Sequence, residues 1–100
     1  MKSLNQYIIE KILINKSSKL NKIKAETLIQ LKSIIQKRYH SNNSFIDLTD
    51  INISELDDLS GVFARLNKVE VIDIYGWDTS NVITMDCMFS QCSKLKKLLE

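Results

Sequence analysis

The order of apolar and polar positions predicts two helices in the first forty residues. A first helix is expected over about residues 3–14 and a second over about residues 25–39, because apolar side chains recur there at three- and four-residue spacing. Residues 20–24 alternate between apolar and polar, which indicates a short extended segment between them, and residues 40–44 form a polar loop. The apolar positions are Leu4, Tyr7, Ile8 and Ile12 in the first helix and Leu28, Leu31, Ile34 and Ile35 in the second.

The rest of the chain contains two copies of a 26-residue pattern. Residues 46–71 align without a gap with residues 72–97, and the paired positions keep their apolar character over the whole length. Each copy starts with an apolar-polar-apolar triplet, which predicts a short strand, and continues through a polar bend into an expected helix near residues 56–66 or 82–92. The matching pairs include Ile46 with Ile72, Asp47 with Asp73, Ser54 with Ser80, Phe63 with Phe89, and Leu66 with Cys92.

Together these elements predict an α/β fold in a single domain. We expect a basic helical leader over residues 1–44 to cap a short leucine-rich-repeat-like solenoid over residues 45–100, made of two strand-helix units with a parallel sheet. The same phase calls for a third strand at Leu98 and Leu99. An exposed strand edge there invites homodimer pairing, unless the neighbouring lysines protect it.

The second copy carries a recognisable motif. Residues 77–95 read WDTSNVITMDCMFSQCSKL, which resembles the WDTSNVTxMxxMFxxCxxL repeat of BspA-type leucine-rich-repeat proteins. The first copy matches less well, with Ile51-Asn52-Ile53-Ser54 in place of the Trp-Asp-Thr-Ser signature. The resemblance implies a parallel-stranded solenoid that serves as a binding surface, commonly in secreted adhesins. The leader, rich in lysine and isoleucine, also resembles that of short repeat proteins encoded by bacteriophages of gut bacteria.

Composition excludes several classes of protein. The 100 residues contain two glycines and no proline, so no glycine-rich phosphate loop is present. No apolar run approaches the ~20 residues of a membrane span. The N-terminus lacks the apolar core of a signal peptide, so we expect a cytoplasmic protein, host-cytoplasmic if phage-encoded, whose two cysteines are reduced.

Charge is distributed unevenly along the chain. Residues 1–40 carry a net charge of +7 and residues 41–86 a net charge of −7, which gives the protein two electrostatic faces. A basic patch of Lys22, Lys24, Lys37 and Arg38 makes a nucleic-acid-associated factor one alternative function, although lysine-rich helix faces are also ordinary solvated surfaces.

Strand alternation separates core residues from candidate binding residues. If Ile46, Leu48, Ile72 and Ile74 point into the core, the other face carries Phe45, Asp47 and Thr49 beside Val71, Asp73 and Tyr75. Asp47 and Asp73 would then be adjacent like charges that favour a basic partner, or two solvated carboxylates without a ligand. Trp77 is expected to pack at the core or its rim, with exposure as a binding anchor as the alternative.

Candidate chemistry is sparse. His40 has no neighbouring nucleophile, and Cys92, in the slot of Leu66, is expected to be a small buried apolar residue. A zinc site of Cys87, Cys92 and His40 is a minor alternative, since no second cysteine pair is present.

We therefore expect a non-enzymatic protein-interaction module without a cofactor, either a phage accessory protein or an inhibitor of a host protein. Its binding residues are Phe45, Asp47, Thr49, Val71, Asp73, Tyr75 and Trp77. The partner is expected to be a protein that is basic at the contact, with nucleic acid and membrane disfavoured. A fragment-like relative of adhesins and a small metal-dependent enzyme are further alternatives.

Overall fold

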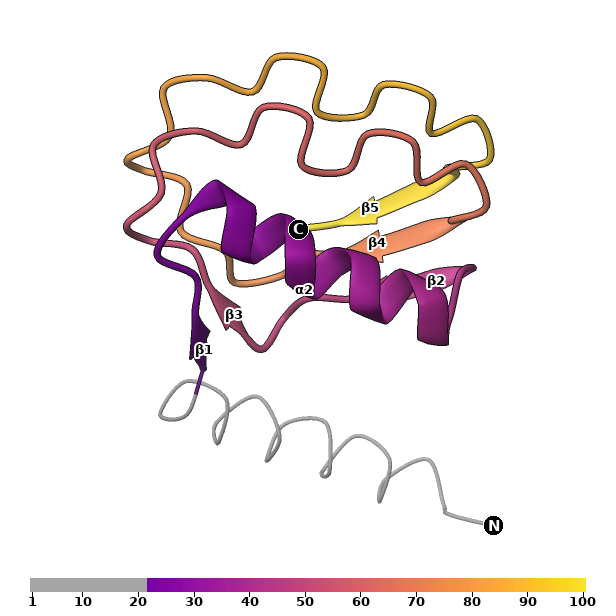
Figure 1. The fold of residues 1–100 in the computed structure, drawn as a ribbon, viewed down its shortest axis with the longest axis horizontal. Helices are drawn as coiled ribbons and strands as arrows, with labels where there is room; N and C mark the ends of the chain where they lie inside the picture. Colours follow the sequence, from indigo (N-terminus) through magenta and orange to yellow (C-terminus); the bar gives the residue numbers. More distant parts are fainter. Residues whose placement is uncertain (1–21) are drawn as a thin grey trace, which may run out of the picture.

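The computed structural model describes residues 22–100, so the predicted first helix over residues 3–14 lies outside the described part. The described residues form a mixed α/β structure with one helix and parallel strands in two sheets (Figure 1). In chain order the elements are β1 (Ile23–Lys24), α2 (Leu28–Ser41), β2 (Phe45–Asp47), β3 (Ile51–Asn52), β4 (Val71–Asp73) and β5 (Lys97–Leu99).

Helix α2 confirms the predicted second helix, with both ends shifted by two or three residues. It begins after Thr27, whose hydroxyl oxygen accepts a hydrogen bond from the Gln30 amide at 3.1 Å. It ends at Ser41, and the amide of the capping residue Asn42 donates to the Arg38 carbonyl at 2.9 Å. His40, expected in a loop, therefore lies in the last turn of the helix, where a basic side chain is favourable beside the unpaired carbonyls.

The strands pair in the predicted 26-residue phase. In the larger sheet the order is β2-β4-β5, and Ile46 lies beside Ile72, which lies beside Leu98. This register confirms a parallel sheet and a third strand start at residues 97–99. The smaller sheet joins β1 to β3 in parallel, so residues 23–24 are extended as expected.

The predicted helices over residues 56–66 and 82–92 are wrong. Both segments consist of successive turns in which an amide donates to the carbonyl three residues earlier, as from Val62 to Leu59 at 3.2 Å. The same bond recurs 26 residues later, from Met88 to Met85 at 3.2 Å. Apolar spacings of three and one residues fit this run of turns as well as they fit a helix face, so periodicity alone did not distinguish the two.

Left-handed backbone explains why no helix forms there. Gly61 and Arg65 have φ angles of 64° and 68°, and one period later Cys87 and Gln91 have φ angles of 56° and 60°. A right-handed helix requires negative φ at every position. Two left-handed residues four positions apart in each segment therefore interrupt any helix, and the segments run as the zigzag of turns seen in Figure 1.

The core lies between the sheet and the turns of the first copy. Apolar side chains from α2, β2, β3, β4 and those turns are buried together, and Phe63 is fully enclosed. Its ring stacks on Trp77 at a centroid distance of 5.9 Å and on Phe89 at 5.5 Å. These contacts join the first copy of the pattern, residues 46–71, to the second, residues 72–97; we call them unit 1 and unit 2.

Candidate functional site

The candidate site is a groove of about 460 Å³ beside β2. It is formed where the last turns of α2 meet β2 and the loop that follows, because Asn42 ends the helix and turns the chain directly into the strand. The side-chain oxygen of Asn42 accepts hydrogen bonds from the amides of Ser44 and Phe45 at 3.2 and 3.3 Å. The lining residues are Arg38, Ser41, Asn42, Phe45, Ile46, Asp47, Thr49 and Asp50.

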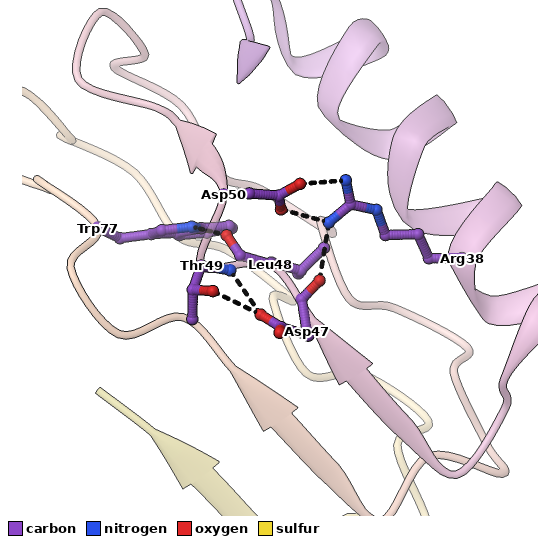
Figure 2. A network of polar contacts seen from close by, with 6 residues as sticks. All are labelled: Arg38, Asp47, Leu48, Thr49, Asp50 and Trp77. Carbon is purple, nitrogen blue, oxygen red and sulfur yellow. Dashed lines mark hydrogen bonds and ion pairs between the residues drawn. The ribbon is translucent and has the colours of Figure 1, made fainter. Parts of the chain in front are cut away.

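An ion pair fixes one wall of the groove. The two guanidinium nitrogens of Arg38 donate to the two carboxylate oxygens of Asp50 at 2.6 and 2.9 Å (Figure 2). One of those nitrogens also donates to the backbone carbonyl of Asp47 at 2.8 Å. These contacts raise the pKa of Arg38 and lower the pKa of Asp50, so both groups stay charged at neutral pH and hold α2 against the turn after β2.

The floor of the groove, residues 47–50, is held by two further contacts. Both the amide and the hydroxyl of Thr49 donate to Oδ1 of Asp47, at 2.9 and 2.7 Å. From unit 2, the ring nitrogen of Trp77 donates to the carbonyl of Leu48 at 2.8 Å. In Figure 2, Trp77 approaches the loop from the left and Arg38 from the right, and the bonds between Thr49 and Asp47 lie within the loop. The loop is therefore organised before any ligand binds.

Charge and apolar surface lie side by side in the groove. Asp47 is exposed, and within residues 22–100 its Oδ2 has no hydrogen-bond donor, since Thr49 uses only Oδ1. The Phe45 ring, two residues earlier on the same strand face, is 38% exposed. This arrangement can accept a hydrogen bond or a cation at the carboxylate while an apolar group packs on the ring.

The structure brings together three of the seven binding residues expected from the sequence. Phe45, Asp47 and Thr49 line the groove, and Val71 and Asp73 lie next to Phe45 and Asp47 on β4. Tyr75 follows β4 and is 62% exposed. Trp77 is half-buried against Phe63, in agreement with the expected rim packing.

Asp73 differs from the expectation of a solvent-facing carboxylate. It is only 5% exposed, because it lies on the central strand between Asp47 of β2 and Leu99 of β5. Its Oδ1 accepts a hydrogen bond from the Tyr75 amide at 3.1 Å. The adjacency with Asp47 is as predicted, but Asp73 acts mainly as a cap for the turn after β4.

Two of the four residues of the expected basic patch are paired with carboxylates. Arg38 is paired with Asp50, and the Lys24 ammonium lies 2.8 Å from the carboxylate of Glu55. Lys22 and Lys37 have no carboxylate partner within the described residues. Two of the four cations are thus already matched by acids, which weakens the case for phosphate binding.

The minor zinc alternative is not assembled in the described part of the chain. Across residues 22–100, no three His, Cys, Asp or Glu side chains are close enough together to hold a metal ion. Cys87 is exposed, whereas Cys92 is half-buried and its thiol donates to the Phe63 carbonyl at 2.9 Å. Burial raises the pKa of the Cys92 thiol, as expected of a small buried residue rather than a metal-binding thiolate.

Several residues of the site gave no sequence signal. The sequence places Arg38 in a basic patch and gives no signal for Asp50, because their pairing joins positions twelve residues apart on different elements. Ser41 and Asn42 appeared only as part of a polar loop. An arginine in the last helical turn followed by an aspartate after the next strand is too common a pattern to predict such a pair.

Two further observations concern membrane spans and similarity to known proteins. No helix in the described residues 22–100 is long and apolar enough to cross a membrane. No curated protein and no solved structure matches the chain.

One family model does match, over residues 3–100, and it is described as a Mycoplasma protein of unknown function, DUF285. This family is related to the BspA-like repeat families, which agrees with the resemblance of residues 77–95 at that coarser level. The match spans both units and the helix that precedes them, so the chain belongs to the DUF285 family.

Proposed function

We propose that this protein is a non-enzymatic protein-interaction module that binds its partner through the groove beside β2 and the adjoining strand face. The observation that carries the proposal is the groove itself. It is lined by Phe45, Asp47 and Thr49, the residues that strand alternation places on the face opposite the core. An exposed ring beside an exposed carboxylate is a combination suited to protein recognition.

The rigidity of the groove supports binding rather than chemistry. Its loop is fixed by Arg38, by Trp77 and by the Asp47 carboxylate, so little conformational entropy is lost when a partner binds. The residues that line the groove all belong to residues 22–100. They include hydroxyl and carboxyl groups but no histidine or cysteine. The Thr49 hydroxyl donates to the Asp47 carboxylate, whose same oxygen also accepts from the Thr49 amide, and no histidine in the lining is placed to activate a hydroxyl as a nucleophile.

We further propose that units 1 and 2 are consecutive turns of a short solenoid of the BspA type. The strands, the three-residue turns and the left-handed positions all recur after 26 residues. In such a stack each turn adds one row of side chains to a continuous strand face. The row of Phe45, Val71 and Lys97 and the row of Asp47, Asp73 and Leu99 form this face.

The chemistry of the face indicates the partner. A lysine or arginine side chain of the partner would meet Oδ2 of Asp47, while an aliphatic or aromatic side chain would lie on Phe45 and Tyr75. Because the Asp50 charge is already matched by Arg38, one cation at Asp47 completes the electrostatic match in the groove.

The test is capture of partner proteins from cell lysate with two pairs of matched variants. Phe45→Ala and Asp47→Asn should each reduce the recovered partner at least ten-fold. Asn retains the oxygen that caps Thr49 but removes the charge. The controls are Ile83→Ala and Asp57→Asn, which change exposed residues on the turn side and should leave recovery unchanged.

Equal recovery of the same protein by all four variants would refute the assignment of the groove. A partner lost with the controls and retained with Phe45→Ala would place the binding surface on the turns instead.

A further inference from the structure

The outer edge of β2 presents backbone groups that the described part of the chain uses only in part. β2 lies at the end of the sheet β2-β4-β5. The Leu48 amide donates to the Asp73 carbonyl at 2.9 Å and so points towards β4, and the backbone groups of alternate residues point to opposite sides of a strand. The amides and carbonyls of Phe45 and Asp47 therefore point away from β4, towards the groove.

Two of these four groups are already used. The Phe45 amide donates to the Asn42 side chain at 3.3 Å, and the Asp47 carbonyl accepts from Arg38 at 2.8 Å. Within residues 22–100, the Phe45 carbonyl and the Asp47 amide have no hydrogen-bond partner. Unpaired groups at the edge of a sheet are a template for a further strand.

The identity of the two unpaired groups selects the direction of such a strand. An antiparallel neighbour exchanges two hydrogen bonds with the amide and the carbonyl of one residue, but Phe45 and Asp47 each have one of these groups in use. A parallel neighbour instead uses the carbonyl of one residue and the amide of the residue two positions later. The Phe45 carbonyl and the Asp47 amide are such a pair, so one residue of a parallel strand satisfies both.

The chain itself enters the described structure beside this edge. β1 pairs in parallel with β3, and the Ile23 amide donates at 2.9 Å to the carbonyl of Asp50, which lines the groove. A segment before β1 that lies beside β2 runs parallel to it, because both lead into the β1-β3 pair in the same direction. Residues 16–21, when extended, span roughly 20 Å. This length is sufficient to follow the chain back from Asp50 to Phe45.

The charge of residues 16–21 also suits the edge. They read Lys-Ser-Ser-Lys-Leu-Asn, with two lysines and no acid, whereas Oδ2 of Asp47 has no donor within the described residues. The next residue, Lys22, already takes part in such a match, since Arg38 lowers the pKa of Asp50 most and the Lys22 charge lowers it further. A lysine of this segment therefore finds an unpaired carboxylate oxygen beside β2.

We propose that residues 16–21 bind the outer edge of β2 as a parallel strand. One residue of the segment donates to the Phe45 carbonyl and accepts from the Asp47 amide, and a lysine of the segment pairs with the Asp47 carboxylate. This contact does not depend on the proposed function. Its regulatory consequence does rest on it: the segment closes the partner-binding groove and, being tethered beside it, competes at high effective concentration, so a partner must displace it.

The test follows the Asp47 amide by NMR hydrogen exchange in the 100-residue chain without a partner. Corrected for neighbouring residues, its exchange should be at least ten-fold slower than that of the exposed Lys94 amide, which also has no hydrogen-bond partner within residues 22–100. Lys16→Glu/Lys19→Glu places like charges beside Asp47 and should accelerate its exchange at least ten-fold. The control, Lys68→Glu/Lys94→Glu, makes the same charge change at exposed lysines of units 1 and 2 and should leave the rate unchanged.

A second variant, Ser17→Pro/Ser18→Pro, tests the backbone contact because it removes two consecutive amides and disfavours strand pairing. It should also accelerate exchange of the Asp47 amide. Exchange in the original chain as fast as that of Lys94 would overturn the proposal, as would slow exchange that neither variant accelerates.

Carbodiimide cross-linking of a mixture of isotope-labelled and unlabelled chains tests where the segment comes from. Links between Asp47 and Lys16 or Lys19 should join residues of one chain. Links that join labelled to unlabelled chains would overturn the proposal, because the occupant would then be a second copy. No partner is present in these measurements, so their outcome is separate from that of the lysate experiment.

Discussion

The left-handed residues of the turns can be tested by substitution with glycine. Whether glycine raises or lowers the free energy of unfolding depends on the backbone conformation at the substituted position. Gln91 is exposed and has a φ angle of 60°. A side chain at such an angle costs roughly 1–2 kcal/mol, because Cβ approaches the following carbonyl oxygen. Glycine removes this cost but loses roughly 0.5–1 kcal/mol through its greater freedom in the unfolded chain. Gln91→Gly should therefore stabilise the protein by about 0.5–1 kcal/mol.

A helix over residues 82–92 would give the opposite result. Glycine in place of glutamine inside a helix costs roughly 0.5–1 kcal/mol. The two backbones thus differ by about 1–2 kcal/mol in the expected effect, which exceeds the error of a careful comparison of variants. Arg65→Gly, at the equivalent left-handed position of unit 1, should behave in the same way.

Urea unfolding followed by Trp77 fluorescence measures these changes, because Trp77 is the single tryptophan and stacks on buried Phe63. The control is Lys94→Gly, an exposed position of the same unit outside the left-handed set, which should lose roughly 0.5–1 kcal/mol. A loss of stability in Gln91→Gly as large as that in Lys94→Gly would refute the assignment of left-handed turns.

Three further outcomes are expected. The Arg38 contact lowers the pKa of Asp50, so the stabilisation by the Asp50 carboxylate is present above the ordinary carboxyl range and is lost as pH falls through the lowered pKa. Asp50→Asn should lower the free energy of unfolding by about 1 kcal/mol at pH 7. This variant should also show a flatter pH dependence of urea unfolding below about pH 4. A pH profile identical to that of the original chain would contradict this assignment. Trp77→Phe removes the 2.8 Å bond to the loop after β2 and should cost about 1 kcal/mol, measured by circular dichroism; a cost near zero would mean that water replaces the bond fully. The exposed Cys87 thiol should react with an aromatic disulfide reagent at pH 8 at least ten-fold faster than the Cys92 thiol. Cys92 is half-buried, and burial raises the pKa of its thiol. Equal rates in the native state would contradict the burial of Cys92.

The strand register was predictable because it depends on a period that is visible in the sequence. Aligning Ile46 with Ile72 predicted both the parallel pairing and the position of the third strand at Leu98. The second helix was predictable from apolar spacing, since Leu31 and Ile35 lie on one face and are buried. These predictions rest on local alternation and on repetition, which a single sequence shows directly.

The conformation of the turns was not predictable in the same way. Gly61 is a visible signal for left-handed backbone, but Arg65, Cys87 and Gln91 adopt it without one. Their conformation is set by hydrogen bonds between units, such as that from the Arg65 amide to the Ser90 carbonyl at 2.8 Å. Tertiary contacts of this kind override local preference and leave no trace in the spacing of apolar residues.

The candidate site was predictable only in part, for a related reason. Strand alternation selected Phe45 and Asp47, because it decides which side of β2 each side chain occupies. It could not show that Asp73 would be buried beside β5, or that Arg38 would form an ion pair with Asp50. The role of each charged residue followed from partners distant in sequence.

The strand register also limits how the gene for this protein can change in length. Insertion of one residue between β2 and β4 must be absorbed by a bulge in the turns, because a shift of the β4 pairing by one residue would turn Ile72 away from the core. We therefore expect recombination to add or remove whole units in this lineage, and alleles that differ in length by a few residues within a unit to be eliminated by selection.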